Sequence, residues 1–168
     1  NFPQSPQAAP AAYWLALAAA DERNNSEAQY QVDWLLAHGD PTEQSLTEEQ
    51  TRLWEQTLCL QCQLWAESNN WESIKDLLGE SEQTGNSVAK ARLEFWRAEA
   101  ALRLGNHAEA SERFDKLASS TAGIVEAWVP MVSLRQAQLA ARREDWQSVL
   151  KLVDVHDAKH PEFELAYE

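Results

Sequence analysis

The sequence predicts an all-α protein, an α-α superhelix of about four stacked antiparallel helix hairpins. A residue that can cap a helix recurs four times, at Asn24, Asn70, Asn106 and Asp145. Each cap has a small residue eight positions before it and apolar residues four and eight positions after it. No strand alternation of useful length interrupts this spacing. Together these observations indicate paired helices throughout.

The recurring residues form three sets of expected core contacts. The small residues on the first helix of each pair are Ala16, Cys62, Ala98 and Ala137. Four residues after the caps come Ala28, Ile74, Ala110 and Val149, and eight residues after them come Val32, Leu78, Phe114 and Val153. Because one hairpin of this size cannot bury both of its apolar faces, neighbouring hairpins must stack.

Breaks rich in Gly, Pro, Asp and Ser outline a repeat domain over residues 10–160. The expected helix pairs cover about 10–39, 46–80, 86–120 and 123–160. Residues 1–9 are expected to be an extended lead-in, and residues 161–168 the start of a further repeat. A chain of 168 residues is long enough for a sizeable core and fits one domain.

The first expected helix is almost entirely apolar from Ala8 to Ala20. The run is too short to span a bilayer and lacks the basic start of a signal peptide, so no direct membrane insertion is expected. Tyr13, Trp14 and Leu17 have helical spacing within it. The run therefore predicts a packed helix.

Local residues predict or restrict three later helix starts. Thr47 with Gln50 predicts a capping box at the third helix, and Asn106 with Glu109 predicts a similar start for the sixth. Pro130 is compatible only with a helix that begins or kinks near it.

Composition narrows the classes of partner. Apolar residues make up 44% of the chain, which argues against global disorder despite a net charge of -13. That charge disfavours nucleic acid as a ligand, because nucleic-acid-binding proteins concentrate Lys and Arg on one face. It favours neutral or basic partners.

The segment from Phe95 to Ala118, FWRAEAALRLGNHAEASERFDKLA, resembles a tetratricopeptide repeat. The residues that carry the resemblance are Ala98, Gly105, Asn106, His107, Ala110 and Phe114. Weaker copies are SNNWESIKDLL, REDWQSVLKLV and RNNSEAQYQV. The resemblance covers nearly the whole chain and implies a piece of a longer bacterial protein, with cytoplasm and periplasm both open. Trp71 and Trp146 take the place of the ring at His107 and are expected in the core.

The chain departs from that family in two respects. The caps lie 46, 36 and 39 residues apart, more than the family's usual spacing of about 34. Only Gly105 supplies the turn glycine, and Arg23, Asn69 and Glu144 hold that position elsewhere. The sequence therefore predicts a tetratricopeptide-like solenoid rather than strict copies.

In this family the first helix of each pair lines a concave groove that binds peptides or protein segments. Carried over by position, the resemblance implies partner contacts at Tyr13, Trp14, Arg92, Phe95, Trp96, Glu99, Arg135 and Gln138. In the second pair the lining would be Gln56, Cys59, Leu60 and Gln63. Packing between helices is the alternative for each aromatic residue. Arg92 and Trp96 are the strongest candidates, because aromatic residues and Arg dominate binding hot spots.

The sequence favours neither catalysis nor a cofactor. Cys59 and Cys62 form a single CxxC, which is a weak zinc signal, and Cys62 fits the buried small position instead. His156 and His160 are one turn apart, but no further metal ligand accompanies them. No phosphate loop and no nucleophile motif is present in the sequence. No metal is expected.

These observations predict a non-enzymatic protein–protein interaction scaffold that binds a peptide or protein segment in a concave groove. The alternative is a purely structural segment of a larger multidomain or multi-repeat protein. A further alternative is an accessory domain of an all-helical enzyme. The partner's identity and the oligomeric state are left open.

Overall fold

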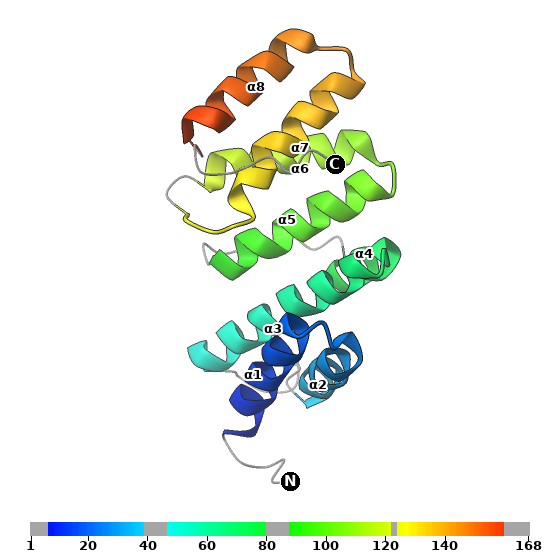
Figure 1. The fold of residues 1–168 in the computed structure, drawn as a ribbon, viewed down its shortest axis with the longest axis vertical. Coiled ribbons are helices and arrows are strands. Elements are labelled where there is room, and N and C mark those ends of the chain that lie inside the picture. Colours follow the sequence, from blue (N-terminus) through cyan, green and yellow to red (C-terminus); the bar gives the residue numbers. More distant parts are fainter. Residues whose placement is uncertain (1–6, 39–46, 80–87, 122–123, 160–168) are drawn as a thin grey trace. The chain divides into compact units, whose positions relative to one another are not determined.

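The computed structural model describes residues 7–38, 47–79, 88–121 and 124–159. All regular secondary structure in these ranges is α-helical, which confirms the predicted fold class. The helices are α1 (Ala8–Asp21), α2 (Asn25–His38), α3 (Glu48–Glu67), α4 (Trp71–Leu78), α5 (Val88–Arg103), α6 (His107–Ser120), α7 (Val129–Arg142) and α8 (Trp146–Lys159) (Figure 1). Consecutive helices pack as hairpins, α1 with α2, α3 with α4, α5 with α6 and α7 with α8.

The chain forms two compact units, residues 1–81 and 82–168. The division falls inside the break predicted between the second and third pairs. Within the first unit, α3 packs against α2 and α1, and within the second, α7 packs against α6. Both units therefore contain the same step, in which the first helix of a hairpin packs against the second helix of the hairpin before it.

Helix α1 begins at Ala8, two residues earlier than expected. Pro10 is tolerated because the first four N–H groups of a helix have no partner within it. The helix is already established at Ala11, whose N–H donates to the Gln7 carbonyl at 3.0 Å. The extended lead-in predicted for 1–9 is therefore wrong for residues 8 and 9. Its residues 1–6 and the further repeat predicted for 161–168 lie outside the described residues.

The predicted capping box at α3 is confirmed. The Thr47 hydroxyl accepts the Gln50 N–H at 3.2 Å, and the Gln50 side chain accepts the Thr47 N–H at 2.9 Å. Helix α7 begins at Val129 with Pro130 in its first turn, one of the two arrangements that the sequence allows.

The capping box predicted for α6 is wrong. The side chain of Asn106 accepts no capping hydrogen bond. Glu109 instead accepts a hydrogen bond from Arg113 Nε at 2.9 Å, one turn farther along the same helix. This i,i+4 ion pair uses the carboxylate that would have closed the box.

Each hairpin turn places one residue in the left-handed region of backbone conformation. The φ angles are 58° at Arg23, 57° at Asn69, 84° at Gly105 and 60° at Glu144. The following residue is in each case the predicted cap, and its N–H donates to a carbonyl five positions back at 2.8–3.0 Å. This is the Schellman arrangement. The carbonyl of the same residue then accepts the first hydrogen bond of the next helix, so the recurring Asn or Asp joins the two helices.

The side chains of three of these residues also cap the following helix. The backbone N–H groups of Glu27, Ser73 and Ser148 donate to the side-chain oxygens of Asn24, Asn70 and Asp145, at 3.4, 3.4 and 3.2 Å. Hydrogen bonds from the side chain and the backbone of Ser148 lower the pKa of Asp145 below its ordinary 3.8. A depressed carboxylate pKa stabilises the fold above the unfolded pKa, so this contribution is lost only when the pH falls through the lowered value.

Substitutions at two of the turns are predicted to have opposite effects. Gly105→Ala should lower the free energy of unfolding by about 1–2 kcal/mol, because an L side chain disfavours positive φ. A Cβ at Gly105 would meet no atom within 4 Å, so the loss is conformational rather than steric. Glu144→Gly relieves the same strain and should raise the free energy of unfolding by up to about 1 kcal/mol. Urea unfolding followed by circular dichroism measures both changes, and a destabilised Glu144→Gly variant would contradict the prediction.

The predicted contact sets form the cores of three hairpins. Ala16, Cys62 and Ala98 are fully buried and Ala137 is nearly so. The residues after the first three caps are buried as well, namely Ala28, Val32, Ile74, Leu78, Ala110 and Phe114. The register expected from the sequence is therefore confirmed for these hairpins.

The fourth hairpin is packed differently. Val149 and Val153 are only half-buried, and the buried side chain of α8 is His156. Its Nδ1 lies 2.8 Å from the Ser133 hydroxyl of α7, which links the two helices. Trp146, expected in the core, is instead 61% exposed. The first turn of α8 has no neighbouring helix on that side among the described residues.

Candidate functional site

The expected partner contacts are divided between the two units. Tyr13 and Trp14 lie on α1 of the first unit, and their rings meet edge to face with centroids 6.1 Å apart. Tyr13 packs against the core of that unit. Trp14 is 68% exposed and available to a partner. The other six residues lie on α5 and α7 of the second unit.

Helix α5 carries a polar row that the spacing of a helix places on one face. The row is Arg92, Trp96, Glu99 and Arg103, at positions i, i+4, i+7 and i+11. Arg135 of α7 donates a hydrogen bond to Glu99 of this row and another to Gln138 of its own helix. We call these six residues the α5–α7 face.

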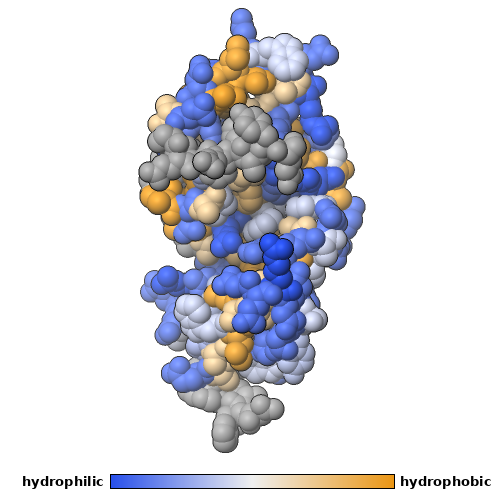
Figure 2. All heavy atoms as spheres, in the orientation of Figure 1, coloured by the Kyte–Doolittle hydropathy of each residue, from blue (hydrophilic) through white to orange (hydrophobic). Residues whose placement is uncertain are grey.

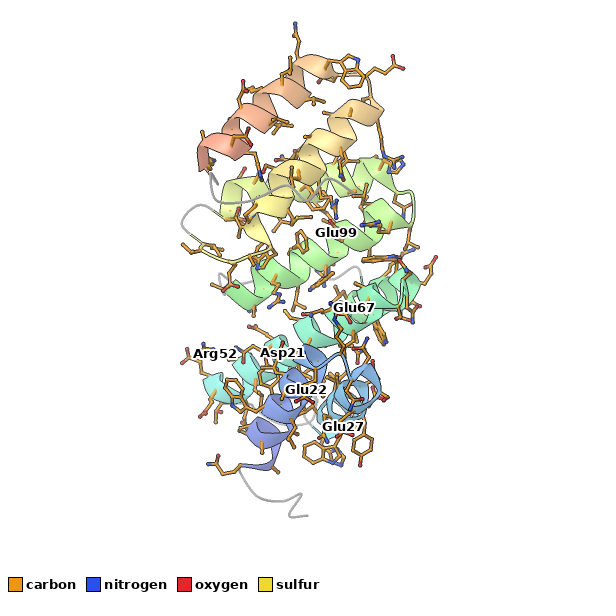
Figure 3. The ribbon with its side chains drawn as sticks, viewed as in Figure 1. Asp21, Glu22, Glu27, Arg52, Glu67 and Glu99 are labelled. Atoms are coloured by element: carbon orange, nitrogen blue, oxygen red, sulfur yellow. The ribbon has the colours of Figure 1, made fainter. Side chains whose placement is uncertain are left out.

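An ion-pair cluster is the centre of the α5–α7 face. The Glu99 carboxylate is buried and accepts a hydrogen bond from Arg135 Nε (Figure 3 labels Glu99). Arg103 Nε lies 3.6 Å from the other oxygen of Glu99. Arg135 also donates from Nη1 to the Gln138 side-chain oxygen at 3.0 Å. The structure thus brings together Glu99, Arg135 and Gln138. Because Glu99 is buried, the partner contact predicted there is instead an internal one, and it fixes the direction of the Arg135 side chain.

Arg92 differs from the other arginines of α5 and α6. The Arg97 guanidinium pairs with Glu94, and the Arg113 guanidinium pairs with Glu94 at 3.3 Å and with Glu109 at 2.9 Å. Arg92 is half-buried, yet no hydrogen bond or ion pair involves its side chain among the residues that the structure describes. No described residue therefore accepts a hydrogen bond from the five N–H donors of its guanidinium.

Trp96 lies one helical turn from Arg92 and is half-buried. Part of its ring packs against the core of the second unit, and its edge meets Phe95 with centroids 5.6 Å apart. This packing fixes the position of the indole. The row therefore presents a positioned aromatic ring between two arginines, Arg92 and Arg103.

Phe95 does not belong to the face. It is buried in the core of the second unit, with its ring centroid 6.2 Å from Phe114 and 5.4 Å from Trp128. Phe95 comes three residues before the buried Ala98, and this spacing places both on the same side of α5. The predicted partner contact is therefore a packing residue, the alternative that the sequence leaves open for aromatic residues.

The same geometry applies in α3. Cys59 comes three residues before Cys62, and both are buried. Leu60 is also buried, so Cys59 and Leu60 do not line an accessible surface of the first unit. Gln56 and Gln63, expected beside them, are half-buried.

Arg103 also belongs to the face, although it was not among the expected contacts. The signal was present, because Arg103 lies four residues after Glu99 and eleven after Arg92, which continues the same helical row. Its exposed guanidinium and the Arg135 guanidinium both pair with Glu99.

Charge is distributed unevenly between the units. Residues 1–81 contain thirteen Asp and Glu but only three Lys and Arg, whereas residues 82–168 contain fourteen acidic and eleven basic residues. The α5–α7 face lies in the second of these units and carries three arginines against one glutamate. The overall charge of -13 therefore does not describe the local charge of this face.

Possible metal ligands do not cluster in the described part of the chain. No three His, Cys, Asp or Glu side chains are placed there to hold a metal ion. His160, the other histidine of the pair considered from the sequence, lies outside the described residues. No helix in the described ranges is both long and apolar enough to cross a bilayer.

Comparison of the chain with protein-family models, curated proteins and solved structures finds no significant match. The fold that can be stated is a set of helices packed as consecutive hairpins, with the left-handed turns and buried small residues described above.

Proposed function

We propose that the chain is a non-enzymatic protein-interaction scaffold of tetratricopeptide-like architecture, which binds a peptide or protein segment on the α5–α7 face. The observation that carries the proposal is that the Arg92 guanidinium has no described hydrogen-bond or ion-pair partner. This arginine is half-buried beside Trp96 and makes no ion pair among the described residues, while neighbouring arginines are paired with glutamates. Binding would supply the acceptors that its guanidinium lacks.

The chemistry of the face indicates what kind of segment it would bind. Arg92 and Arg103 can donate to backbone carbonyls or to a carboxylate, and the Trp96 ring offers an apolar surface between them. Glu99 holds Arg135 in place, so that guanidinium is positioned before a partner arrives. A segment with one apolar side chain flanked by hydrogen-bond acceptors fits this arrangement.

The second candidate function is a structural segment of a larger repeat protein. The observation that favours it is the exposure of large apolar residues on α1 and α8, where Trp14, Leu15, Trp146 and Leu150 are all more than half exposed. Solenoid repeats at a true end normally present a polar outer face. Further hairpins packed on α1 or α8 would cover these residues.

Affinity capture with the full chain as bait tests the proposed function. We expect proteins captured from the source cells by the wild type to be lost at least about tenfold from an Arg92→Ala bait, because arginine at a desolvated hot spot contributes more than 1.4 kcal/mol. Trp96→Ala should cause a similar loss. Quantitative mass spectrometry of the captured proteins gives the ratio.

The matched control is Lys151→Ala, which removes one exposed cation from α8 of the same unit. It should leave capture unchanged. Equal recovery by the wild type, Arg92→Ala and Trp96→Ala would refute binding on the α5–α7 face. Circular dichroism establishes that each bait remains helical.

A further inference from the structure

In both units, hydrogen bonds join the second helix of one hairpin to the first helix of the next. In the first unit, Asn25 of α2 donates to Glu67 of α3 at 3.0 Å. Gln29 and Gln61 join the same helices by a reciprocal pair of amide hydrogen bonds, at 2.7 and 3.1 Å. Asn25 and Gln29 come one and five residues after the cap Asn24, so they form a row on the outer side of α2.

The second unit repeats this row on α6. One, five and nine residues after the cap Asn106 come His107, Ser111 and Asp115. Two are bonded to α7 and one to Arg143, which follows it: Arg142 lies 3.4 Å from His107 Nε2, Gln136 donates to Asp115 at 2.7 Å, and Arg143 donates to Ser111 at 2.9 Å. We call the positions one, five and nine after a cap the cap row of a hairpin.

The helix that packs against a cap row also has a regular pattern of buried residues. Gln61 and Gln136 each come directly before the buried small residue of their helix, Cys62 or Ala137. The residues four before and three after each of these glutamines are buried too, namely Thr57, Leu64, Val132 and Leu139. We call these positions the receiving row.

Helix α1 has a receiving row with no hairpin against it in the described part of the chain. The row is Ala11, Leu15 and Ala18, and all three are exposed, Leu15 by 57%. Every residue of this row is apolar, and Trp14 beside it is exposed as well. The position that is glutamine in α3 and α7 is leucine here.

Helix α8 has the complementary cap row, and no described helix packs against this row either. The row is Trp146, Leu150 and Asp154, and all three are exposed, Leu150 by 68%. Figure 2 shows hydrophobic atoms over the part of the second unit that α8 forms. By position, Leu150 corresponds to Gln29 and Leu15 corresponds to Gln61. A leucine pair would therefore take the place that the Gln29–Gln61 pair has in the α2–α3 contact.

We infer that α8 of one copy of this chain packs against α1 of a second copy, in the register that joins α2 to α3. Leu15 of α1 and Trp146 and Leu150 of α8 are large apolar side chains whose burial would stabilise the contact, while Asp154 lies at the end of its row. The contact is heterologous, because different surfaces of the two copies meet. Each copy therefore keeps one unused row, and association continues from it. This inference does not depend on the α5–α7 face.

Sedimentation velocity of the full chain over a range of concentrations tests the inference. The wild type should show a mass that rises with concentration beyond that of two 19.0 kDa chains. Leu15→Glu and Leu150→Glu should each weaken association about tenfold or more, because each would place an unpaired carboxylate in the contact. Both sites are exposed, so helicity should not change.

The most informative sedimentation sample is an equimolar mixture of the Leu15→Glu and Leu150→Glu variants. The first variant keeps an intact α8 row and the second keeps an intact α1 row, so one native junction can form and growth must stop at two chains. Tyr30→Glu and Val125→Glu are matched controls, because these exposed residues lie outside both rows and should leave association unchanged. A monomeric wild type, association that survives either row substitution alone, or a mixture that stays monomeric would each overturn the inference.

Discussion

Arg135→Ala is expected to lower the free energy of unfolding of the second unit by about 3–5 kcal/mol. The reason is the state in which the substitution leaves Glu99. This carboxylate is buried and pairs with Arg135, and the remaining arginine beside it, Arg103, lies farther away at 3.6 Å and is half exposed. Removing Arg135 leaves a buried charge without its main partner. Hydrogen exchange of α5 and α7 peptides, followed by mass spectrometry, measures the change, with peptides of α1 and α2 as an internal reference.

Replacing both Glu99 and Arg135 distinguishes the loss of their ion pair from the cost of leaving a buried charge unpaired. Glu99→Leu combined with Arg135→Met removes both charges and retains apolar volume, so this double variant should be far more stable than Arg135→Ala alone. If the double variant and Arg135→Ala were equally destabilised, the buried carboxylate would not be the cause. A loss below about 1 kcal/mol for Arg135→Ala would show that the pair behaves as an exposed one.

Phe114→Ala should also destabilise the second unit by about 3–5 kcal/mol. Phe114 is fully buried eight residues after its cap, and its ring meets Phe95 edge to face. Truncation removes this contact and leaves a cavity in the core that also includes Trp128 and Leu117. The same exchange measurement on α5 and α6 peptides gives the loss.

Val153→Ala is the matched control at the same position of the repeat. Val153 is half-buried, so its truncation should cost about 1 kcal/mol or less. Equal losses at Phe114 and Val153 would contradict the conclusion that the fourth hairpin departs from the register of the third.

The hairpin register could be predicted because it depends on local chemistry. A Schellman turn needs a residue that tolerates positive φ, then a residue that joins the two helices, and Gly105 and the caps provide that signal in the sequence. The turns at Arg23 and Glu144 carry no such residue. The caps Asn24 and Asp145, each with a small residue eight positions before it, predict these two turns instead.

The site could be predicted less well, because exposure depends on contacts between helices. Phe95 and Trp96 are adjacent in the sequence, but only Phe95 lies on the side of α5 that faces the core. The ion pair between Glu99 and Arg135 joins residues thirty-six positions apart, and no local spacing indicates it. Trp146 was expected in the core from its place in the repeat, and its exposure reflects the lack of a described helix beside it.

Site-specific photo-crosslinking in the cells that produce the protein tests the proposed function most directly. A photoreactive phenylalanine analogue at Gln138 would lie on the α5–α7 face, and one at Val125 would be an exposed position outside it. The account predicts discrete adducts with another protein from position 138, none from position 125, and loss of the adducts when Arg92→Ala and Trp96→Ala are added. Identical adducts from both positions, or adducts that survive both substitutions, would contradict it.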